Sequence, residues 1–184
     1  RLFSEKGYAQ TTIDDISKAS EYSRRTIYTY YKSKEDILHH IIEKGLRSLK
    51  VDIENAANEN AGFIEAYRAV CSAKIRYRKE YPHSLETVKR SGAAEIEQMA
   101  ASDTVKSILC LGAEINGILE ALIVRGQKSG EVRKDVVPVL TVYILSTSID
   151  SLLTLAETKG KFICAQNGMT EEAFIDYGFR QIIN

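Results

Sequence analysis

The sequence predicts an all-α protein of about nine helices, on three observations. Only two prolines, Pro82 and Pro138, occur in the chain, and proline is the residue that helix interiors tolerate least. No run of alternating apolar and polar residues with hairpin turns is present, so strands are not expected. Helix-capping residues recur instead, before segments whose apolar side chains are spaced three or four positions apart.

Capping residues define two short helices near the N-terminus. Thr12 is followed three positions later by Asp15, the pattern of a capping box in which each side chain satisfies a free N–H group. Acidic residues in this first turn also suit the helix dipole, so a helix is expected from residue 13. Ser23 caps a second short helix, which runs through Tyr30.

A third and longer helix is expected over residues 34–58. Ser33, with Asp36 three residues later, caps its start. Its apolar residues recur every three to four positions and form one buried stripe: Ile37, Leu38, Ile41, Ile42, Leu46, Leu49 and Ile53.

Five further helices account for the rest of the chain. We expect them over residues 63–81 (ending at Pro82), 83–101, 103–127 (capped by Asp103), 136–158 (capped by Asp135 and ended by Gly160) and 170–183 (opened by Thr170).

Composition excludes several classes of protein. The apolar fraction of 44% is too high for a disordered chain. Three widely spaced cysteines, an odd number, argue against a disulfide framework or a zinc site and fit a reducing cytoplasm. The longest apolar stretches, residues 108–124 and 136–155, are interrupted by polar residues, so no membrane span is expected. The first residue is Arg1 rather than Met, so we expect the natural protein to start earlier.

The formal net charge of zero hides an uneven distribution. Residues 1–50 contain ten basic and seven acidic residues, and the remainder of the chain has the opposite excess. Four of the basic residues fall between positions 24 and 34, with tyrosines between them. A DNA partner requires only such a local basic surface.

The first fifty residues have the pattern of a helix-turn-helix. Two short helices meet at residues 19–23, with Ile13 and Ile16 on the buried side of the first and Ile27 and Tyr31 on that of the second. In this arrangement the second helix lies in the major groove of DNA with its N-terminal residues toward the base edges. The alternative is that these basic residues and tyrosines form an ordinary solvated face.

The expected DNA contacts follow from the chemistry of each side chain. Arg24 and Arg25 suit bidentate reading of guanine, and Thr26 suits a phosphate or a thymine methyl group. The hydroxyls of Tyr28 and Tyr30 suit phosphate oxygens. Lys34 stands at the next helix N-terminus, where backbone N–H groups also attract phosphate.

Three stretches, residues 3–16, 23–31 and 32–38, resemble the N-terminal domain of the TetR (tetracycline repressor) family. The resemblance implies phosphate contacts from Thr12, Tyr28, Tyr30 and Lys34, and a recognition helix that starts at Ser23, Arg24, Arg25 and Thr26. This sequence departs from the family pattern at three positions. Glu21 replaces the usual turn glycine, Tyr22 a small branched apolar residue, and Thr29 an aromatic one, which affects the expected operator sequence more than the fold.

The resemblance also implies that three regions of the chain have different functions. Residues 1–33 form the DNA-binding domain with an incomplete N-terminus, residues 34–58 a linking helix, and residues 59–184 a domain that binds an effector and dimerises. In the effector domain, an apolar wall with a few polar groups suits a ligand. We expect this wall from Phe63, Tyr67, Cys71, Tyr77, Asn116 and Glu120. The alternative is that the aromatic residues are ordinary core and the carboxylates face water.

The helix over 136–158 is apolar on more than one side, which predicts a second buried face. The resemblance implies that this helix and the last one pair with their twofold mates. The expected interface residues are Val142, Leu145, Ile149, Leu152, Phe174, Phe179 and Ile182. The alternative is a monomer whose central helix is fully buried.

The leading hypothesis is therefore a cytoplasmic, homodimeric transcriptional regulator. It would act as a repressor that a small-molecule effector releases from double-stranded operator DNA. Control by thiol oxidation, through Cys71 or Cys110, or by a partner protein is the alternative. An all-helical enzyme is the third hypothesis, although the sequence has no acid/base, nucleophile or phosphate-loop pattern. We expect no cofactor and no metal, since the adjacent His39 and His40 point to different helix faces.

Overall fold

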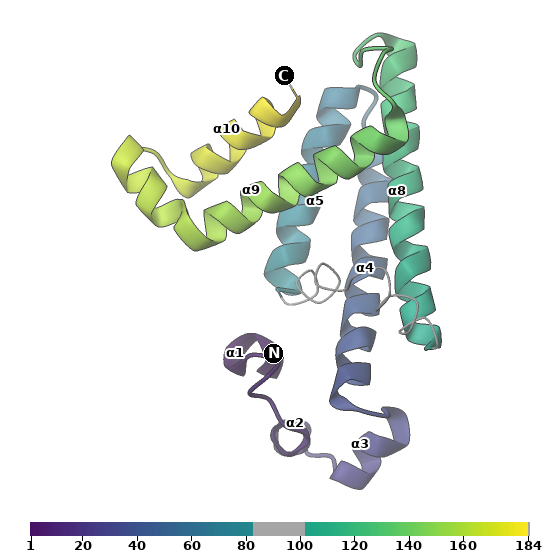
Figure 1. Cartoon of the computed structure of the whole chain (residues 1–184), viewed down its shortest axis with the longest axis vertical. Coiled ribbons are helices and arrows are strands. Elements are labelled where there is room, and N and C mark those ends of the chain that lie inside the picture. Colours follow the sequence, from purple (N-terminus) through teal and green to yellow (C-terminus); the bar gives the residue numbers. More distant parts are fainter. Residues whose placement is uncertain (83–101, 184) are drawn as a thin grey trace. The chain divides into compact units, whose positions relative to one another are not determined.

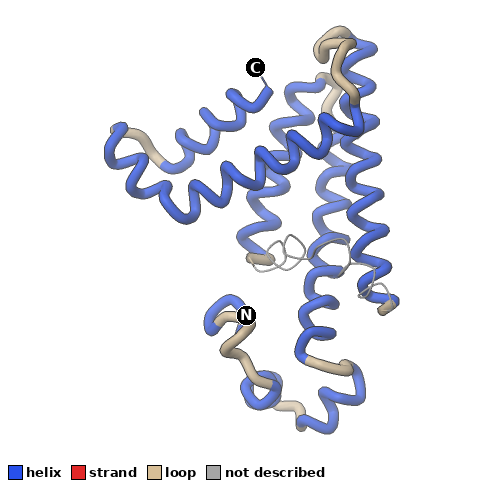
Figure 2. The backbone as a smooth tube through the Cα atoms, in the orientation of Figure 1, coloured by secondary structure: helices blue, strands red, loops and turns tan. Residues whose placement is uncertain are grey.

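The computed structural model describes residues 1–82 and 102–183, and the regular structure of this part of the chain is entirely helical (Figures 1 and 2). Its helices are α1 (Leu2–Lys6), α2 (Ile13–Ser20), α3 (Arg24–Tyr30), α4 (Lys34–Glu59), α5 (Phe63–Glu80), α8 (Asp103–Ser129), α9 (Pro138–Asn167) and α10 (Glu171–Ile183). The predicted all-α fold is confirmed. The helix expected over 83–101 lies outside the described residues.

The predicted caps form at four helix starts. The backbone N–H of Asp15 bonds to the Thr12 hydroxyl and the N–H of Thr12 to the Asp15 carboxylate, which completes the capping box of α2. At α3, the N–H of Thr26 bonds to the Ser23 hydroxyl at 3.1 Å. The hydroxyls of Ser33 and Thr170 accept equivalent bonds at the starts of α4 and α10, at 3.0 and 3.1 Å.

The bounds of α9 differ from the prediction at both ends. Val137 takes the N-cap position without a side-chain bond, so Asp135 does not cap this helix. The helix continues through Gly160 and ends at Gly168, whose φ of 62° and N–H bond to the Cys164 carbonyl form a left-handed cap. A glycine inside a helix costs only about 1 kcal/mol, so its presence alone does not end one.

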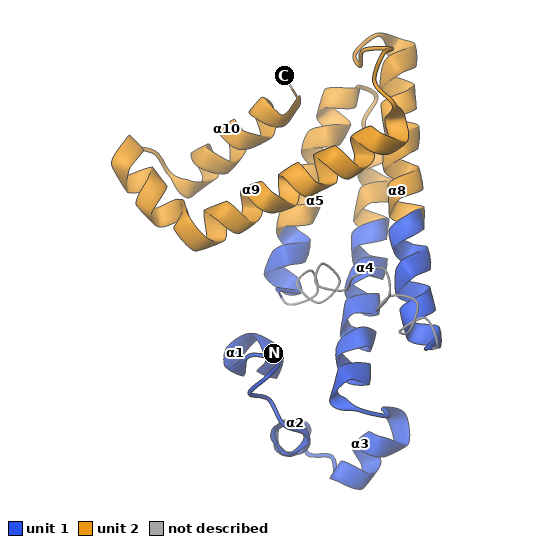
Figure 3. Cartoon of the chain, viewed as in Figure 1, with its two compact units in different colours: residues 1–50, 76–113 blue, residues 51–75, 114–184 orange. Residues whose placement is uncertain are grey.

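By internal contacts the chain divides into two compact units (Figure 3). Unit 1 contains residues 1–50 and 76–113, and unit 2 contains residues 51–75 and 114–184. The division falls within α4, α5 and α8, so each of these helices has residues in both units. It is a division by packing, and the functional division at residues 33 and 58 remains a prediction.

The core of unit 1 joins its N-terminal helices to α4 and α8. Phe3, Leu38, Ile42 and Ile108 form a buried cluster, and Tyr8, Ile16, Ile37 and Leu46 pack against it. Burial of each large apolar side chain contributes about 1.5–3 kcal/mol. Ile41, expected in the same stripe, is 37% exposed, so the buried face of α4 is narrower than predicted.

A glycine permits the close approach of α4 and α5 within unit 1. A Cβ atom at Gly45 would lie 2.9 Å from the ring of Tyr81 and 3.0 Å from that of Tyr77. These two rings stack on each other with centroids 5.6 Å apart. Any other residue at position 45 would therefore push against a stiff aromatic pair.

In unit 2, side chains satisfy the ends of two helices. Arg125 donates hydrogen bonds to the carbonyls of Ala57 (2.7 Å) and Asn60 (3.0 Å) at the end of α4. The carboxylate of Glu131 accepts the N–H of Phe63 at the start of α5, at 3.0 Å. That bond is the largest cause of the lowered pKa of Glu131. α10 packs along α9, and the hydroxyl of Tyr67 donates to the carbonyl of Phe179 at 3.1 Å.

One side of α9 exposes apolar side chains. They are Val139, Leu140, Tyr143, Ile144, Leu155 and Phe162. By length and composition alone, α8 and α9 each pass as possible membrane spans, a test that core helices of soluble proteins also pass. The second buried face that the sequence predicts for α9 stays a prediction, and the exposed apolar residues of this helix are other than the expected interface residues.

Candidate functional site

The turn between α2 and α3 contains a strained residue. Glu21 ends α2 with φ 62° and ψ 9°, and it is the one non-glycine residue with positive φ in the described part of the chain. This is the position at which the family pattern has glycine, and a side chain here costs conformational energy. The Ser17 hydroxyl donates to the Tyr22 carbonyl at 2.6 Å and closes the turn.

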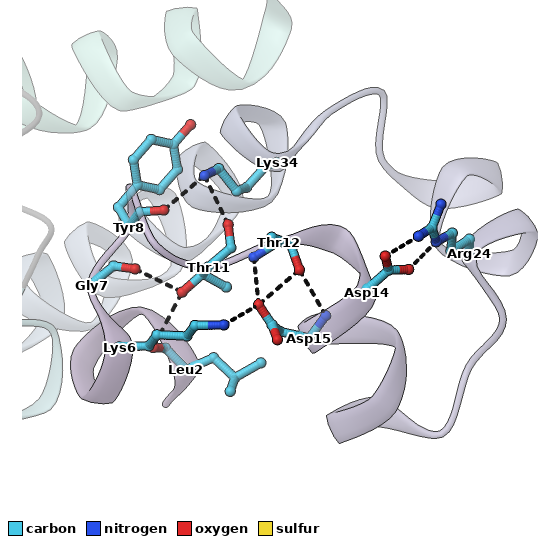
Figure 4. Close-up of polar contacts among 10 residues, drawn as sticks. All are labelled: Leu2, Lys6, Gly7, Tyr8, Thr11, Thr12, Asp14, Asp15, Arg24 and Lys34. Atoms are coloured by element: carbon cyan, nitrogen blue, oxygen red, sulfur yellow. Dashed lines mark hydrogen bonds and ion pairs between the residues drawn. The ribbon is translucent and has the colours of Figure 1, made fainter.

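The start of α2 is held by a network around Asp15 (Figure 4). Its Oδ2 accepts bonds from Lys6 Nζ at 2.6 Å and from the N–H and hydroxyl of Thr12 at 2.8 Å. The bond from Lys6 is the largest cause that holds the pKa of Asp15 well below its usual range. The Thr12 hydroxyl already donates within this box, so its local role is to cap the helix.

Lys34 joins α4 to the segment before α2 (Figure 4). Its Nζ donates to the carbonyls of Tyr8 (2.8 Å) and Thr11 (2.9 Å) and lies 4.3 Å from the centroid of the Tyr8 ring. An ammonium group has three N–H donors, so one remains for a phosphate. Lys34 therefore stabilises unit 1 in addition to any contact with DNA.

Arg24, at the start of α3, pairs with Asp14 in the first turn of α2 (Figure 4). The Nε and Nη2 groups of the guanidinium donate to the two carboxylate oxygens. Both side chains are open to solvent, at 61% and 46% exposure. The pair joins the two helices of the helix-turn-helix at its surface.

The rest of α3 presents basic and aromatic side chains around one buried anchor. Ile27 is buried, whereas Arg25, Tyr28 and Tyr30 are exposed. Thr26 is half-buried, and its hydroxyl shares a 2.8 Å bond with that of Ser23. Short residues at the cap and long ones on the open side give α3 the side chains that a groove-reading helix needs.

Asp14 and Tyr8 were not predicted to take part in this surface. Asp14 occupies a first-turn position that any acidic residue favours through the helix dipole, so its sequence signal was assigned to capping alone. The bond from Lys34 to the Tyr8 carbonyl joins residues 26 positions apart. Main-chain acceptors at such a separation have no sequence signal.

Unit 2 contains a small, partly open cavity between α5, α8 and α9. Its volume is about 30 Å³, measured as the space open to the centre of a water molecule. The wall is formed by Phe63, Tyr67, Val70, Lys74, Leu119, Leu122, Ile123, Val142, Leu145, Ser146 and Ile149. This space holds about two water molecules, so a larger ligand requires the walls to move apart.

Charged and thiol groups are buried beside this cavity. Lys74 Nζ lies 3.4 Å from Asp150 Oδ1, and both side chains are nearly buried. Buried charges of this kind require a partner because desolvation is costly. Cys71 is also buried, and burial raises the pKa of its thiol to about 12.

The structure places the predicted effector residues in different surroundings. Phe63 and Tyr67 line the cavity, but Cys71, Asn116 and Glu120 are not part of its wall. Tyr77 belongs to unit 1, where it packs against Tyr81. Helical spacing did not identify which turns of α5 face the cavity.

The predicted dimer residues also differ from the expectation. Val142, Ile149 and Phe179 are buried within the protomer, and Val142, Leu145 and Ile149 line the cavity. Leu152, Phe174 and Ile182 are half-buried. α9 has two apolar faces, and the expected residues lie mainly on the inner one.

Comparison with known proteins matches the N-terminal residues to one family. Residues 1–41 match the model of the bacterial regulatory proteins of the tetR family. This part of the chain therefore has the DNA-binding domain of TetR-type regulators. The match supports a DNA-binding transcriptional regulator.

Relatives match along the length of the chain. The HTH-type transcriptional regulator YhgD of Bacillus subtilis is 27% identical over 145 residues, covering 79% of this chain and 73% of YhgD. The crystal structure of PfmR from Thermus thermophilus has a TM-score of 0.70 at 24% identity, covering 99% of this chain and 92% of PfmR. FadR from B. subtilis in complex with stearoyl-CoA has a TM-score of 0.72 at 20% identity, covering 100% and 92%.

Proposed function

We propose that the protein is a homodimeric repressor whose effector releases it from operator DNA. The observation that carries the proposal is the α3 surface, where Arg24, Arg25, Tyr28 and Tyr30 stand exposed around the buried Ile27. Two such helices in a dimer address half-sites one turn of DNA apart, about 34–36 Å. Because operator DNA lies in the cytoplasm of a bacterium, this function also places the protein there.

Each side chain has a distinct proposed role on DNA. Arg24 and Arg25 read base edges, while Tyr28, Tyr30 and the third donor of Lys34 bind phosphates. The hydroxyls of Thr12 and Ser23 cap their helices, and the hydroxyl of Thr26 bonds to that of Ser23; all three contact the DNA backbone from these positions. The net charge of zero keeps non-specific attraction modest, so selectivity depends on the arginines.

The first experiment compares base-reading with phosphate-binding residues by gel shift on DNA fragments that the protein selects. Arg24→Ala or Arg25→Ala lowers the preference for selected over unrelated DNA, by about 5- to 100-fold if a bidentate base contact is lost. Tyr30→Phe weakens both DNAs alike. Tyr22→Phe is the matched control, since Tyr22 is 63% exposed and has no assigned role. Equal losses of preference from the arginine and tyrosine variants would contradict these roles.

The cavity of unit 2 is the proposed effector site. Its wall is apolar apart from Lys74, Ser146 and the hydroxyl of Tyr67, which matches a ligand with an apolar body and one polar end. The likeness to FadR in complex with stearoyl-CoA supports an acyl chain as that body. Such a ligand would expand the cavity and shift the protein toward a state with lower operator affinity.

The effector test uses stearoyl-CoA and octanoyl-CoA as probes. We expect one of them to raise the melting temperature and to release DNA. Val70→Phe fills the cavity and abolishes both effects while DNA binding persists, because Val70 lines its wall. Val51→Phe, a change at a position 53% exposed, is the matched control. No response to either probe by a DNA-binding dimer would reject acyl-CoA as the effector.

The exposed apolar face of α9 is the proposed dimer surface. Leu140, Tyr143, Ile144, Leu155 and Phe162 recur at helical spacing on this face, and burial against a second copy would remove them from water. We expect Ile144→Arg to convert the dimer to monomers in sedimentation experiments. Thr29→Arg, a change of similar size on α3, leaves the dimer intact.

The long helix α4 is the proposed link between the effector and DNA. The functional division places residues 1–33 on DNA, residues 34–58 in the link, and residues 59–184 around the effector and the dimer. The thiol alternative is less favoured at Cys71, because burial raises the pKa of its thiol and keeps it protonated at neutral pH, whereas Cys110 is exposed. Control by a partner protein predicts no response to any acyl-CoA.

A further inference from the structure

We propose that Asp14 is a positioning residue that fixes the Arg24 guanidinium for guanine and makes it a poor ligand for phosphate. The proposal rests on the assignment of Arg24 to base reading made above. It goes beyond that assignment because it places part of the DNA specificity on an acidic side chain of the preceding helix.

The geometry of the pair leaves the base-reading edge of Arg24 open. A guanidinium has five N–H donors. Asp14 accepts one from Nε and one from Nη2, along the side edge of the group. Three donors remain, two on Nη1 and one on Nη2, and one from each of these nitrogens forms the end edge. Two parallel bonds from this end edge match O6 and N7 of guanine, so Asp14 and a base bind the same guanidinium from different edges.

Both Asp14 and Arg24 lie at the capped N-terminal ends of their helices. Asp14 lies in the first turn of α2, which the Thr12–Asp15 capping box fixes, and Arg24 is the first residue of α3, capped by Ser23. Arginine has many rotamers in solution, and a bidentate carboxylate reduces that freedom before DNA arrives. An exposed ion pair contributes little to stability, so its main effect is on orientation.

The pair also changes what Arg24 binds. The Asp14 carboxylate offsets the positive charge, which weakens attraction to the phosphate backbone. The hydrogen-bonding fork of Arg24 remains available to a base. By contrast, no ion pair involves Arg25 in the described residues. The two arginines therefore differ in kind, with Arg24 more selective for bases and Arg25 more attracted to phosphate.

The test selects preferred sequences from double-stranded DNA with a randomised segment, using the full chain. It then measures affinity for the preferred DNA, for variants of it at each guanine, and for unrelated DNA. We expect Asp14→Asn to lower discrimination at one guanine position by about three- to tenfold, a part of the loss caused by Arg24→Ala. Affinity for unrelated DNA rises because a negative charge is removed. Glu35→Gln, an exposed charge change in the same unit, raises unrelated binding without changing discrimination.

Two further measurements separate positioning from a structural role. On the Arg24→Ala background, Asp14→Asn has no effect on discrimination, because its target is gone. In the free protein, the NMR signal of the Arg24 Nε–H group reports restricted motion that Asp14→Asn releases. That signal does not depend on DNA.

The outcomes distinguish the two proposals. If Arg24→Ala leaves discrimination unchanged, the assignment of Arg24 fails and the role of Asp14 fails with it. If Arg24→Ala lowers discrimination but Asp14→Asn does not, only the role of Asp14 is overturned. Equal losses from Asp14→Asn and Glu35→Gln, or an Arg24 signal that Asp14→Asn does not alter, also overturn it.

Discussion

The α2–α3 surface of unit 1 keeps its functional side chains in water, whereas unit 2 arranges its own around a small apolar cavity. On the surface, position is set by caps and short hydrogen bonds, such as those at Asp15 and Lys34. In the cavity, position is set by packing and by one buried ion pair, Lys74 with Asp150. Surface contacts are individually weak and buried ones are costly to break, so equal changes in the two regions should have unequal effects.

The largest effect is expected from the buried pair. Lys74→Ala leaves the Asp150 carboxylate without its lysine in a buried site, and should lower the free energy of unfolding by about 3–5 kcal/mol. Urea unfolding at one protein concentration measures it. Lys44→Ala, at an exposed position, is the control. We expect the double variant Lys74→Met with Asp150→Leu to recover the lost stability. A loss of stability from Lys74→Ala no larger than that from Lys44→Ala would contradict the contrast between buried and surface contacts.

A smaller effect is expected at the capping box of α2. Thr12→Ala removes the hydroxyl that accepts the Asp15 N–H at 3.2 Å, and loss of such a cap costs about 0.5–2 kcal/mol. Thermal unfolding followed by circular dichroism measures the change. Thr29→Ala removes an exposed hydroxyl from inside α3, where no cap depends on it. Equal losses of thermal stability from the two variants would show that the capping box stabilises the protein no more than an ordinary exposed hydroxyl does.

A gain is expected at the turn. Glu21→Gly relieves the positive φ of 62° and should stabilise the protein by about 0.5–1 kcal/mol. Glu21→Ala is the control, because it removes the charge and keeps the Cβ atom, and it should give no gain. If Glu21→Gly and Glu21→Ala both improved stability, the gain would come from removal of the charge and not from the backbone conformation.

The smallest effect is expected from acid. Hydrogen bonds lower the pKa of Asp15 on the surface and of Glu131 in unit 2. A carboxylate with a lowered folded-state pKa stabilises the protein above the ordinary value, near pH 4, and this contribution is lost as the pH falls. Asp15→Asn and Glu131→Gln should each reduce the stability difference between about pH 5 and pH 3. Urea midpoints at both pH values provide the test.

Local signals in the sequence predicted the starts of several helices well. The caps at Thr12, Ser23 and Ser33 lie within three residues of their targets, so each was readable from spacing. The C-terminal end of α9 could not be predicted from spacing in this way. Gly160 and Gly168 are the same residue type, and only packing decides which one ends the helix.

The cavity was less predictable because its wall comes from three helices far apart in the sequence. The apolar residues of α9 gave no sign of whether they face inward or outward. Val142 and Ile149 were therefore expected at the dimer surface but line the cavity. Two apolar faces on one helix can be told apart only when the neighbouring helices are in place.

The three cysteines give the chain a measuring point that needs no mutation. Cys71 and Cys164 are buried, and Cys110 on α8 is exposed. A thiol-reactive spin label should therefore attach to each protomer mainly at Cys110. In a homodimer the two labels define one distance across the twofold axis. Its change on adding operator DNA or an acyl-CoA would record the motion of the regulator in solution.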